Sequence, residues 1–195
     1  MISACIGASY VVRGVGRVFS RDTVLILTWN HVIFVVLTMV EVRELLEYNQ
    51  NVRHEYFEKL ASIPWREFTK NREASFHSIR NIFIHALNAM DYWLDFVQNE
   101  ELLSKRKFDE YKTFDEVRAY MEHVENRMVS YLESLSARDL KGKHKVTCDG
   151  GETIEVTAED ILIHVFEEEV HHRGELIALL WQMNIEPPPM GWKGL

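Results

Sequence analysis

Four side chains with the chemistry of metal ligands stand in two segments that the sequence predicts to be helical. His164, Glu168 and His172 follow one another at four-residue steps. On a helix of 3.6 residues per turn, each such step turns by only about 40°, so the three side chains share one narrow stripe. The fourth, His85, stands among apolar residues in NIFIHALNAMDYW. Two imidazoles and one carboxylate from facing helices would bind a divalent metal ion and leave coordination positions open.

The stripe that carries these groups is also the apolar face of its helix. It includes Ile161, Val165, Leu176, Leu179 and Met183. Charged groups on a buried face need a partner or a metal. Each group also has an ordinary interpretation, because a lone histidine on an apolar face is more often a satisfied core residue. Glu168 belongs to a run of three glutamates, of which Glu167 and Glu169 are expected to point to water. His171 lies about 100° around the helix from His172 and is expected at the surface or beside the site.

Apolar residues recur at three- and four-residue steps in four stretches, which predict the helices that would position the ligands. These stretches are residues 40–61, 73–98, 114–135 and 158–183. Pro64 ends the first helix, and the alternating charges of residues 104–113 indicate a solvated linker. The predicted fold class is therefore all-α, an antiparallel four-helix bundle with one long crossover connection.

A small β-hairpin is predicted before the last helix. The segment KHKVTCDGGETIEV has two β-prone runs around Asp149, Gly150 and Gly151, the chemistry of a tight turn. Thr157 and Asp160 then suit a helix start, with a hydroxyl to cap and an acid in the first turn. Pro187, Pro188 and Pro189 end the last helix and favour an extended tail through Trp192.

Length and composition are typical of one ordinary globular domain. The 195 residues are 47% hydrophobic and 27% charged, which excludes disorder, collagen-like repeats and a polytopic membrane protein. A formal charge of −8 gives no general attraction to phosphate backbones or anionic lipid, so neither nucleic acid nor membrane is an expected partner. Cys5 and Cys148 lie far apart in sequence and indicate neither a disulfide framework nor a thiolate zinc site. A reducing, cytoplasmic location is expected.

Residues 1–38 differ in composition from the rest, since Asp22 is their only acid. The apolar run 23–40 could suit a transmembrane helix, but Asn30 and His31 in its middle would be costly in a bilayer. A signal peptide fits less well because the run begins late. The β-branched residues could instead form an extra strand, a helix on the bundle or an aggregation-prone tail. We expect the functional domain to be residues 39–195, with 1–38 an atypical N-terminal extension.

The segment EEEVHHRGELIALLWQMNIEPPPMGW, preceded by His164, resembles the last helix and tail of the DinB-like superfamily, the YfiT-like metalloenzymes. The family pattern has one histidine four residues before a second, which opens a His-Arg-Gly triplet, here His172-Arg173-Gly174. It also places a histidine in the second helix before aromatic residues, as His85 precedes Tyr92 and Trp93. The resemblance covers about residues 40 to 192. The DNA polymerase that shares the DinB name is unrelated to it.

The resemblance implies that His85 and His172 bind a divalent metal and that the family's remaining histidine falls on Glu168. A carboxylate can still bind Zn, Ni, Mn or Fe, but it changes the charge and metal preference of the site. His164 then corresponds to a family position beside the ligands rather than a primary ligand. The triplet's other residues are expected to serve packing, Gly174 by close helix approach and Arg173 by pairing with an acid.

Family activities define the functional expectation. The leading one is a metal-dependent S-transferase acting on a low-molecular-weight thiol, with a metal-dependent hydrolase as the alternative. A non-catalytic, stress-associated metal-binding bundle is the third candidate, and the ligand set alone would also suit an iron oxygenase. The expected partners are a small-molecule substrate and a second copy of the chain in a homodimer. Tyr92 and Trp93 are expected either in the core or at a pocket beside the metal.

Overall fold

The computed structural model describes residues 41–98, 107–147 and 151–191, together with the backbone of three strands that precede them. The chain forms two compact units, residues 1–40 and 41–195. In the first unit, β1 (Phe19–Ser20), β2 (Thr23–Thr28) and β3 (His31–Val35) form an antiparallel sheet in that order. The apolar run therefore contains strands, as its β-branched residues favour. The alternatives of a membrane-spanning helix or a helix on the bundle do not fit these segments.

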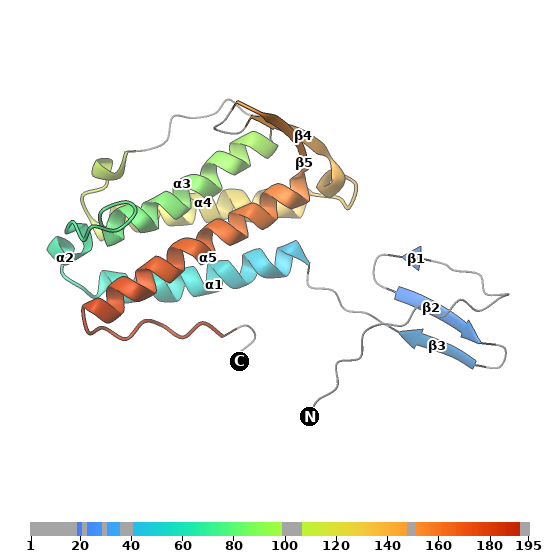
Figure 1. Ribbon diagram of the computed structural model, residues 1–195, viewed down its shortest axis with the longest axis horizontal. Helices are drawn as coiled ribbons and strands as arrows, with labels where there is room; N and C mark the ends of the chain where they lie inside the picture. Colours follow the sequence, from blue (N-terminus) through green and yellow to red (C-terminus); the bar gives the residue numbers. More distant parts are fainter. Residues whose placement is uncertain are drawn as a thin grey trace. The chain divides into compact units, whose positions relative to one another are not determined.

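Four long helices make up the second unit, which confirms the predicted all-α class (Figure 1). They are α1 (Val42–Ala61), α3 (Ile79–Val97), α4 (Phe114–Ser134) and α5 (Ala158–Gln182). Three of them begin and end within two residues of the predicted limits. Helix α3 begins six residues later than predicted, because Glu73 and His77 have φ of 57° and 69°, outside the range of a right-handed helix. Ser78 caps it by accepting a hydrogen bond from the Asn81 amide.

Two helices of the bundle run in each direction. Helices α1 and α5 run one way and α3 and α4 the other (Figure 1), and α5 packs along both α3 and α1. Because α3 and α4 are parallel, the chain between them must return the length of a helix, which is the predicted long crossover. Apolar side chains from all four helices meet in one core, among them Phe57, Leu60, Ile82, Met121, Leu162 and Leu180.

Three short helical elements were not predicted. They are α2 (Trp65–Thr69) and the 3₁₀ turns η1 (Phe108–Glu110) and η2 (Asp139–Lys141). Each is too short to show a helical period in the sequence. Helix α2 supplies Trp65 and Phe68 to an aromatic cluster with Phe114, with ring centroids 4.8 to 5.4 Å apart. Element η1 places Phe108 against the bundle, so this end of the predicted linker is ordered against the core.

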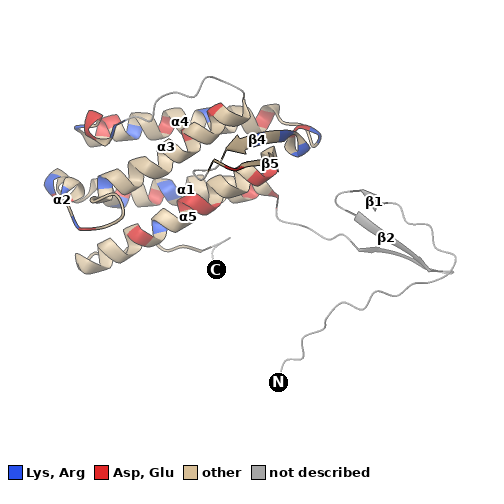
Figure 2. Ribbon diagram, turned by 45° about the horizontal axis from the view of Figure 1, so that its top comes forward, with Lys and Arg blue, Asp and Glu red and all other residues tan. Residues whose placement is uncertain are grey.

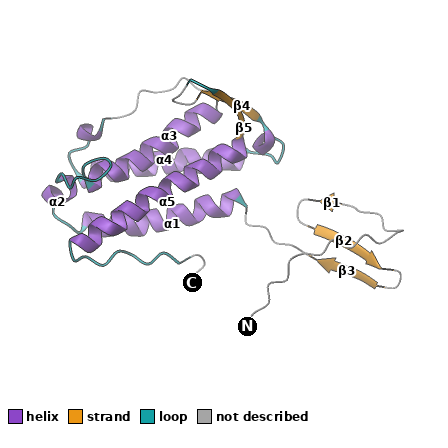
Figure 3. Cartoon of the chain, in the orientation of Figure 1, coloured by secondary structure: helices purple, strands orange, loops and turns teal. Residues whose placement is uncertain are grey.

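The predicted hairpin is present at the end of the bundle where α5 begins (Figure 3). Its strands are β4 (Lys143–Thr147) and β5 (Thr153–Thr157), and its turn residues 148–150 lie outside the described residues. Strand β5 continues directly into α5, where Thr157 caps the helix and Asp160 lies in its first turn, as predicted. The two residues also form a reciprocal capping box. After α5 the tail lies along the bundle, and the Tyr56 hydroxyl donates a hydrogen bond to the Pro188 carbonyl at 3.3 Å. Trp192 lies outside the described residues.

Acidic and basic residues are interspersed along the helices of the bundle (Figure 2). Within the described residues, no helix combines the length and the apolar character that a membrane crossing requires.

Candidate metal centre

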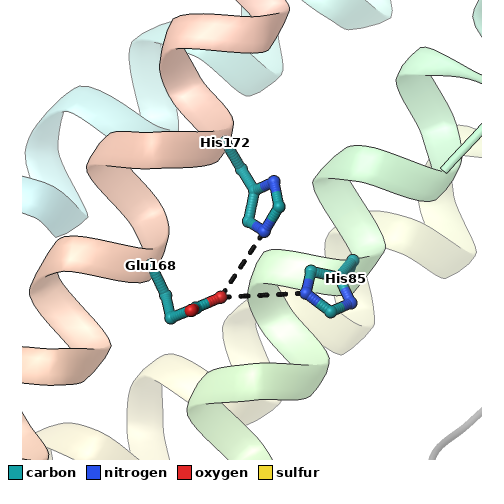
Figure 4. Close-up of side chains that lie close together, drawn as sticks. All are labelled: His85, Glu168 and His172. Atoms are coloured by element: carbon teal, nitrogen blue, oxygen red, sulfur yellow. Dashed lines mark ion pairs between the residues drawn. The ribbon is translucent and has the colours of Figure 1, made fainter. Parts of the chain in front are cut away.

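The structure brings together the three predicted ligands, although they come from two helices. Glu168 and His172 stand one turn apart on α5, and His85 reaches them from α3 (Figure 4). One oxygen of Glu168, Oε2, lies 3.5 Å from His172 Nε2 and 3.8 Å from His85 Nε2. The ring centroids of the two histidines are 4.6 Å apart. The donor atoms of all three residues lie within 4.8 Å of one another.

These spacings fit a divalent cation. Two ligands about 2.1 Å from a tetrahedral metal lie about 3.4 Å apart. The two separations measured from Glu168 Oε2 are close to that value, and both exceed the length of a good hydrogen bond. The donors also form a gradient of exposure, since the His172 side chain is 7% exposed and those of His85 and Glu168 are 22% and 31% exposed. The group is therefore anchored in the core at His172 and open to solvent on the other side.

Glu175, which was not among the predicted site residues, orients His172. Its Oε1 lies 3.3 Å from His172 Nδ1, and its Oε2 accepts a hydrogen bond of 2.5 Å from the Ser75 hydroxyl. A carboxylate beside Nδ1 favours the tautomer that carries the proton there, which leaves Nε2 free to bind a metal. The available signal was its spacing: Glu175 follows His172 by three residues, on the same side of the helix.

Phe76 is the second residue that the sequence did not reveal. Its ring stacks on His85 with centroids 3.8 Å apart and 19° between the planes, and it meets His172 edge-on at 5.5 Å. The loop before α3 holds Phe76 in place, since Asn81 Nδ2 donates to the Phe76 carbonyl at 2.8 Å. Residues Glu73 and His77 on either side have the positive φ values that keep this loop out of α3. The same backbone feature that delays the helix thus places an aromatic ring over the ligand group.

His164 lies one turn before Glu168 on α5, and Trp93 packs against it. His164 Nε2 is 3.7 Å from the other oxygen of Glu168, Oε1, and the His164 side chain is 45% exposed. Trp93 meets His164 edge-on at 5.3 Å and also contacts Tyr92. Trp93 packs against the core, which is the first of the two interpretations, and within the described part of the chain neither ring lines a pocket beside the ligands.

Glu169 was expected to point to water, but it faces Arg53 instead. Its carboxylate accepts two hydrogen bonds from Arg53 of α1, at 3.1 and 2.5 Å, and its side chain is only 11% exposed. Arg53 also donates to Glu125 of α4 at 2.5 Å, and His54 Nε2 lies 2.9 Å from the second Glu125 oxygen. Burial alone would lower the pKa of Arg53, but the carboxylates of Glu169 and Glu125 outweigh it and raise the pKa. Glu167 is exposed, as predicted.

The expectations for Arg173 and Gly174 were wrong in detail. Arg173 is buried, but it donates to the amide oxygen of Asn49 at 3.2 Å and lies over the Tyr48 ring, so its described partners are not acids. Gly174 is exposed, and an added Cβ would meet nothing within 4 Å. Close helix approach therefore does not explain the glycine. The adjacent His171 is 71% exposed, in agreement with the expected surface position.

A pocket of about 540 Å³ opens beside His85, between the start of α3 and η1. Its lining comprises Phe76, Arg80, Asn81, His85, Asn88, Lys107, Phe108 and Asp109. Phe76 and Phe108 meet edge-on, with centroids 6.0 Å apart, and form an aromatic wall. The pocket thus gives a small molecule access to the histidine that α3 contributes to the ligand group.

A second group of possible ligands overlaps the first. His171, His172 and Glu175 also have donor atoms within 4.8 Å of one another. In this second group, both oxygens of Glu175 already have partners: Oε2 accepts a hydrogen bond from Ser75, and Oε1 faces the Nδ1 atom of His172. The separations of 3.3 and 3.5 Å from Glu175 Oε1 are similar to those of the first group, but all of the second group's donors stand on α5, whereas the first group draws its donors from two helices.

The fold and this group describe a class of protein: a helical bundle in which two histidines and a carboxylate from facing helices could hold a metal ion. A family model described as the DinB family matches residues 37–193, and the chain belongs to that family. It is 23% identical over 141 residues to YizA, an uncharacterized protein of Bacillus subtilis strain 168. The alignment covers 72% of this chain and 87% of YizA.

Two solved structures share the fold. A DinB-like protein from Bacillus cereus ATCC 10987 matches with a TM-score of 0.57 and 15% identity, over 76% of this chain and 94% of that chain. YjoA, a DinB-like protein from Bacillus subtilis, matches with a TM-score of 0.53 and 19% identity, over 76% of this chain and 96% of that chain. The family expected from the His-Arg-Gly motif is thereby confirmed.

Proposed function

We propose that the chain is a divalent-metal-dependent enzyme, with the ion held by His85, Glu168 and His172 and a low-molecular-weight thiol as substrate. The observation that carries the proposal is the spacing of the three donors. Glu168 Oε2 lies 3.5 and 3.8 Å from two imidazole nitrogens, which suits ligands of one cation better than partners in a hydrogen bond. The chemistry of the donors suits Zn, Ni, Mn or Fe.

The surroundings of the site support chemistry rather than structural binding alone. Three protein ligands leave at least one coordination position of the metal open. A small molecule could reach the centre through the pocket beside His85. A bound divalent cation would lower the pKa of a thiol or water that completes its shell. Glu175 would hold His172 in the required tautomer, and Phe76 would shield the His85 ring from water. His164, half exposed beside Glu168, would pass a released proton to solvent.

Thiol transfer is favoured over hydrolysis by the resemblance to family members with assigned chemistry. It agrees with a cytoplasmic location, which we also propose, because low-molecular-weight thiols are kept reduced there. We propose a homodimer as well, supported by exposed apolar residues at intervals along one side of α5: Ile163, Val170 and Trp181.

Metal content tests the ligand set first. Protein purified without added metal and then loaded with cobalt should hold one ion per chain. His85→Ala and His172→Ala should each lose that ion while keeping most helicity, because apolar packing stabilises the bundle. His171→Ala is the matched control and should keep it. Retention of the ion in His85→Ala together with its loss in His171→Ala would move the site to the second ligand group and overturn the proposal.

Thiol titration then tests the reaction class. A low-molecular-weight thiol should change the visible spectrum of the cobalt protein, and a model electrophile should be consumed faster than with free cobalt. No spectral change, together with ester or amide cleavage that Glu168→Ala abolishes, would instead identify a hydrolase. Absence of both responses in fully loaded protein would identify a non-catalytic metal-binding bundle.

A further inference from the structure

Arg80 is a partly buried cation in the wall of the pocket beside His85. It stands in the first turn of α3, five residues before His85, which corresponds to about 7.5 Å along the helix axis. Its Nε donates to Asn81 Oδ1 at 3.0 Å and its Nη1 to the Tyr111 carbonyl at 3.4 Å. Both of these partners are uncharged. Among the residues that the structure describes, no carboxylate forms an ion pair with Arg80.

The environment of Arg80 disfavours its positive charge. Burial lowers the pKa of its guanidinium, and Asp109 opposes the shift only in part. Arg53 is neutralised directly by Glu125 and Glu169, and Arg72 by Glu67, whereas the buried Arg173, like Arg80, has no carboxylate among its described partners. A guanidinium has five N–H donors in a fixed plane, and the two contacts above leave several of them for another group.

The charges around the pocket favour an anion. Arg80 and Lys107 line it with positive charge, and Asp109 is its one acid among the lining residues. The Asn81 and Asn88 side chains add polar groups that would border a ligand on the same side. Asn81 already holds Arg80 through its Oδ1 and the Phe76 loop through its Nδ2, so the guanidinium has a fixed direction. A planar, fixed guanidinium matches the two oxygens of a carboxylate.

We propose that the pocket selects small molecules that carry a carboxylate, which Arg80 binds while the reactive end of the molecule lies at His85. The inference rests on the proposed function, since it names the substrate class of the same site: a thiol with a carboxylate several bonds from its sulfur. Arg80 is a specificity-determining residue in this proposal. Lys107 adds to the positive potential at the mouth of the pocket.

Matched thiols test the preference directly. The cobalt-loaded full-length protein would be titrated with 4-mercaptobutyrate and with 4-mercaptobutan-1-ol, which differ in the carboxylate, and binding followed by the visible spectrum. The carboxylate should tighten binding by about tenfold, as a charge-assisted hydrogen bond does. Arg80→Gln should remove the preference and leave the affinity for the alcohol unchanged. Arg66→Gln is the matched control, because Arg66 is 85% exposed, and it should keep the preference.

The outcomes separate this inference from the proposed function. Helicity and cobalt content of Arg80→Gln show whether the variant folds, and Lys107→Gln gives a second variant, which should weaken the preference in part. Equal binding of the two thiols to the unaltered protein, or a preference that survives Arg80→Gln, would overturn the inference while the thiol function stands.

If neither thiol changes the spectrum, the thiol function fails. Calorimetry of the zinc protein with glutarate and pentane-1,5-diol then tests the carboxylate site alone, where equal or absent binding of glutarate would overturn it.

Discussion

The Nδ1 atom of His172 lies against the carboxylate of Glu175, and that contact sets what His172 can do at Nε2. The Ser75 hydroxyl fixes the other Glu175 oxygen at 2.5 Å, so the carboxylate is itself positioned by the loop before α3. A chain of hydrogen bonds thus runs from a loop through an acid to an imidazole. Such partners raise the basicity of the ligand and hold its ring in the right plane.

Loss of this carboxylate should weaken metal binding without unfolding the protein. For Glu175→Gln we expect the affinity for zinc to fall about 10- to 100-fold, the usual effect of removing a partner that orients a metal-binding histidine. Competition with a chelator of known affinity measures it. Glu167→Gln, an exposed glutamate on the same helix, is the control and should bind zinc normally. Unchanged affinity in Glu175→Gln would mean that the His172 tautomer does not depend on Glu175.

Helix α1 supplies no proposed metal ligand, but it links α5, which carries two of the ligands, to α4. Arg53 donates to Glu169 of α5 and to Glu125 of α4, and all three side chains are nearly or fully buried. Glu169 directly follows Glu168, so this contact fixes the rotation of α5 at the ligand group. Apolar packing alone would tolerate small rotations of a helix, whereas a two-pronged ion pair holds one orientation.

Replacing Arg53 should destabilise the protein because it leaves the carboxylates of Glu125 and Glu169 unpaired in the interior. For Arg53→Met in the metal-free protein we expect the free energy of unfolding to fall by about 3 to 5 kcal/mol, as breaking a buried pair does. Urea denaturation measures the change. Lys143→Met, which breaks an exposed pair with Glu155 on the hairpin, should have little effect.

The companion replacement tests the cause of that loss. Arg53→Met combined with Glu125→Leu and Glu169→Leu should recover most of the stability, since no charge is then left buried. A triple variant as unstable as Arg53→Met would show that lost packing, rather than the unpaired carboxylates, is responsible.

At the scale of the whole molecule, the chain has two compact units, and the candidate metal centre lies entirely in the second. The division falls between residues 40 and 41, and the family match begins at residue 37. The core and the ligand-bearing helices described above all belong to residues 41–195. The domain limits of 39–195 remain a prediction, which this distribution of contacts supports.

A chain that begins at Met39 should therefore keep its fold and its metal. We expect it to match the full chain in helicity per bundle residue, midpoint of urea unfolding and cobalt content. Sedimentation of both chains would measure the proposed homodimer at the same time. Aggregation or loss of cobalt in the shorter chain alone would show that residues 1–38 belong to the functional domain.

The sequence by itself determined the helices, the hairpin and the stripe of ligands, because these follow from periods of three to four residues and from capping chemistry. His164, Glu168 and His172 share a stripe whatever surrounds their helix. The Thr157 and Asp160 capping box likewise depends on residues three positions apart. The placement of His85 opposite that stripe was also predicted, from its apolar neighbours and the family motif.

Only the tertiary structure decided which residues complete the site. Phe76 reaches His85 because two residues with positive φ fold the loop back, and no period in the sequence reports such a loop. Glu169 looked like a solvated member of a glutamate run until α1 brought Arg53 against it across 116 positions of sequence. Arg80 and His85 line one pocket because η1 lies beside the start of α3 and supplies the opposite wall. Local periodicity fixes which face of a helix is apolar, whereas contacts between distant segments fix what each polar side chain meets.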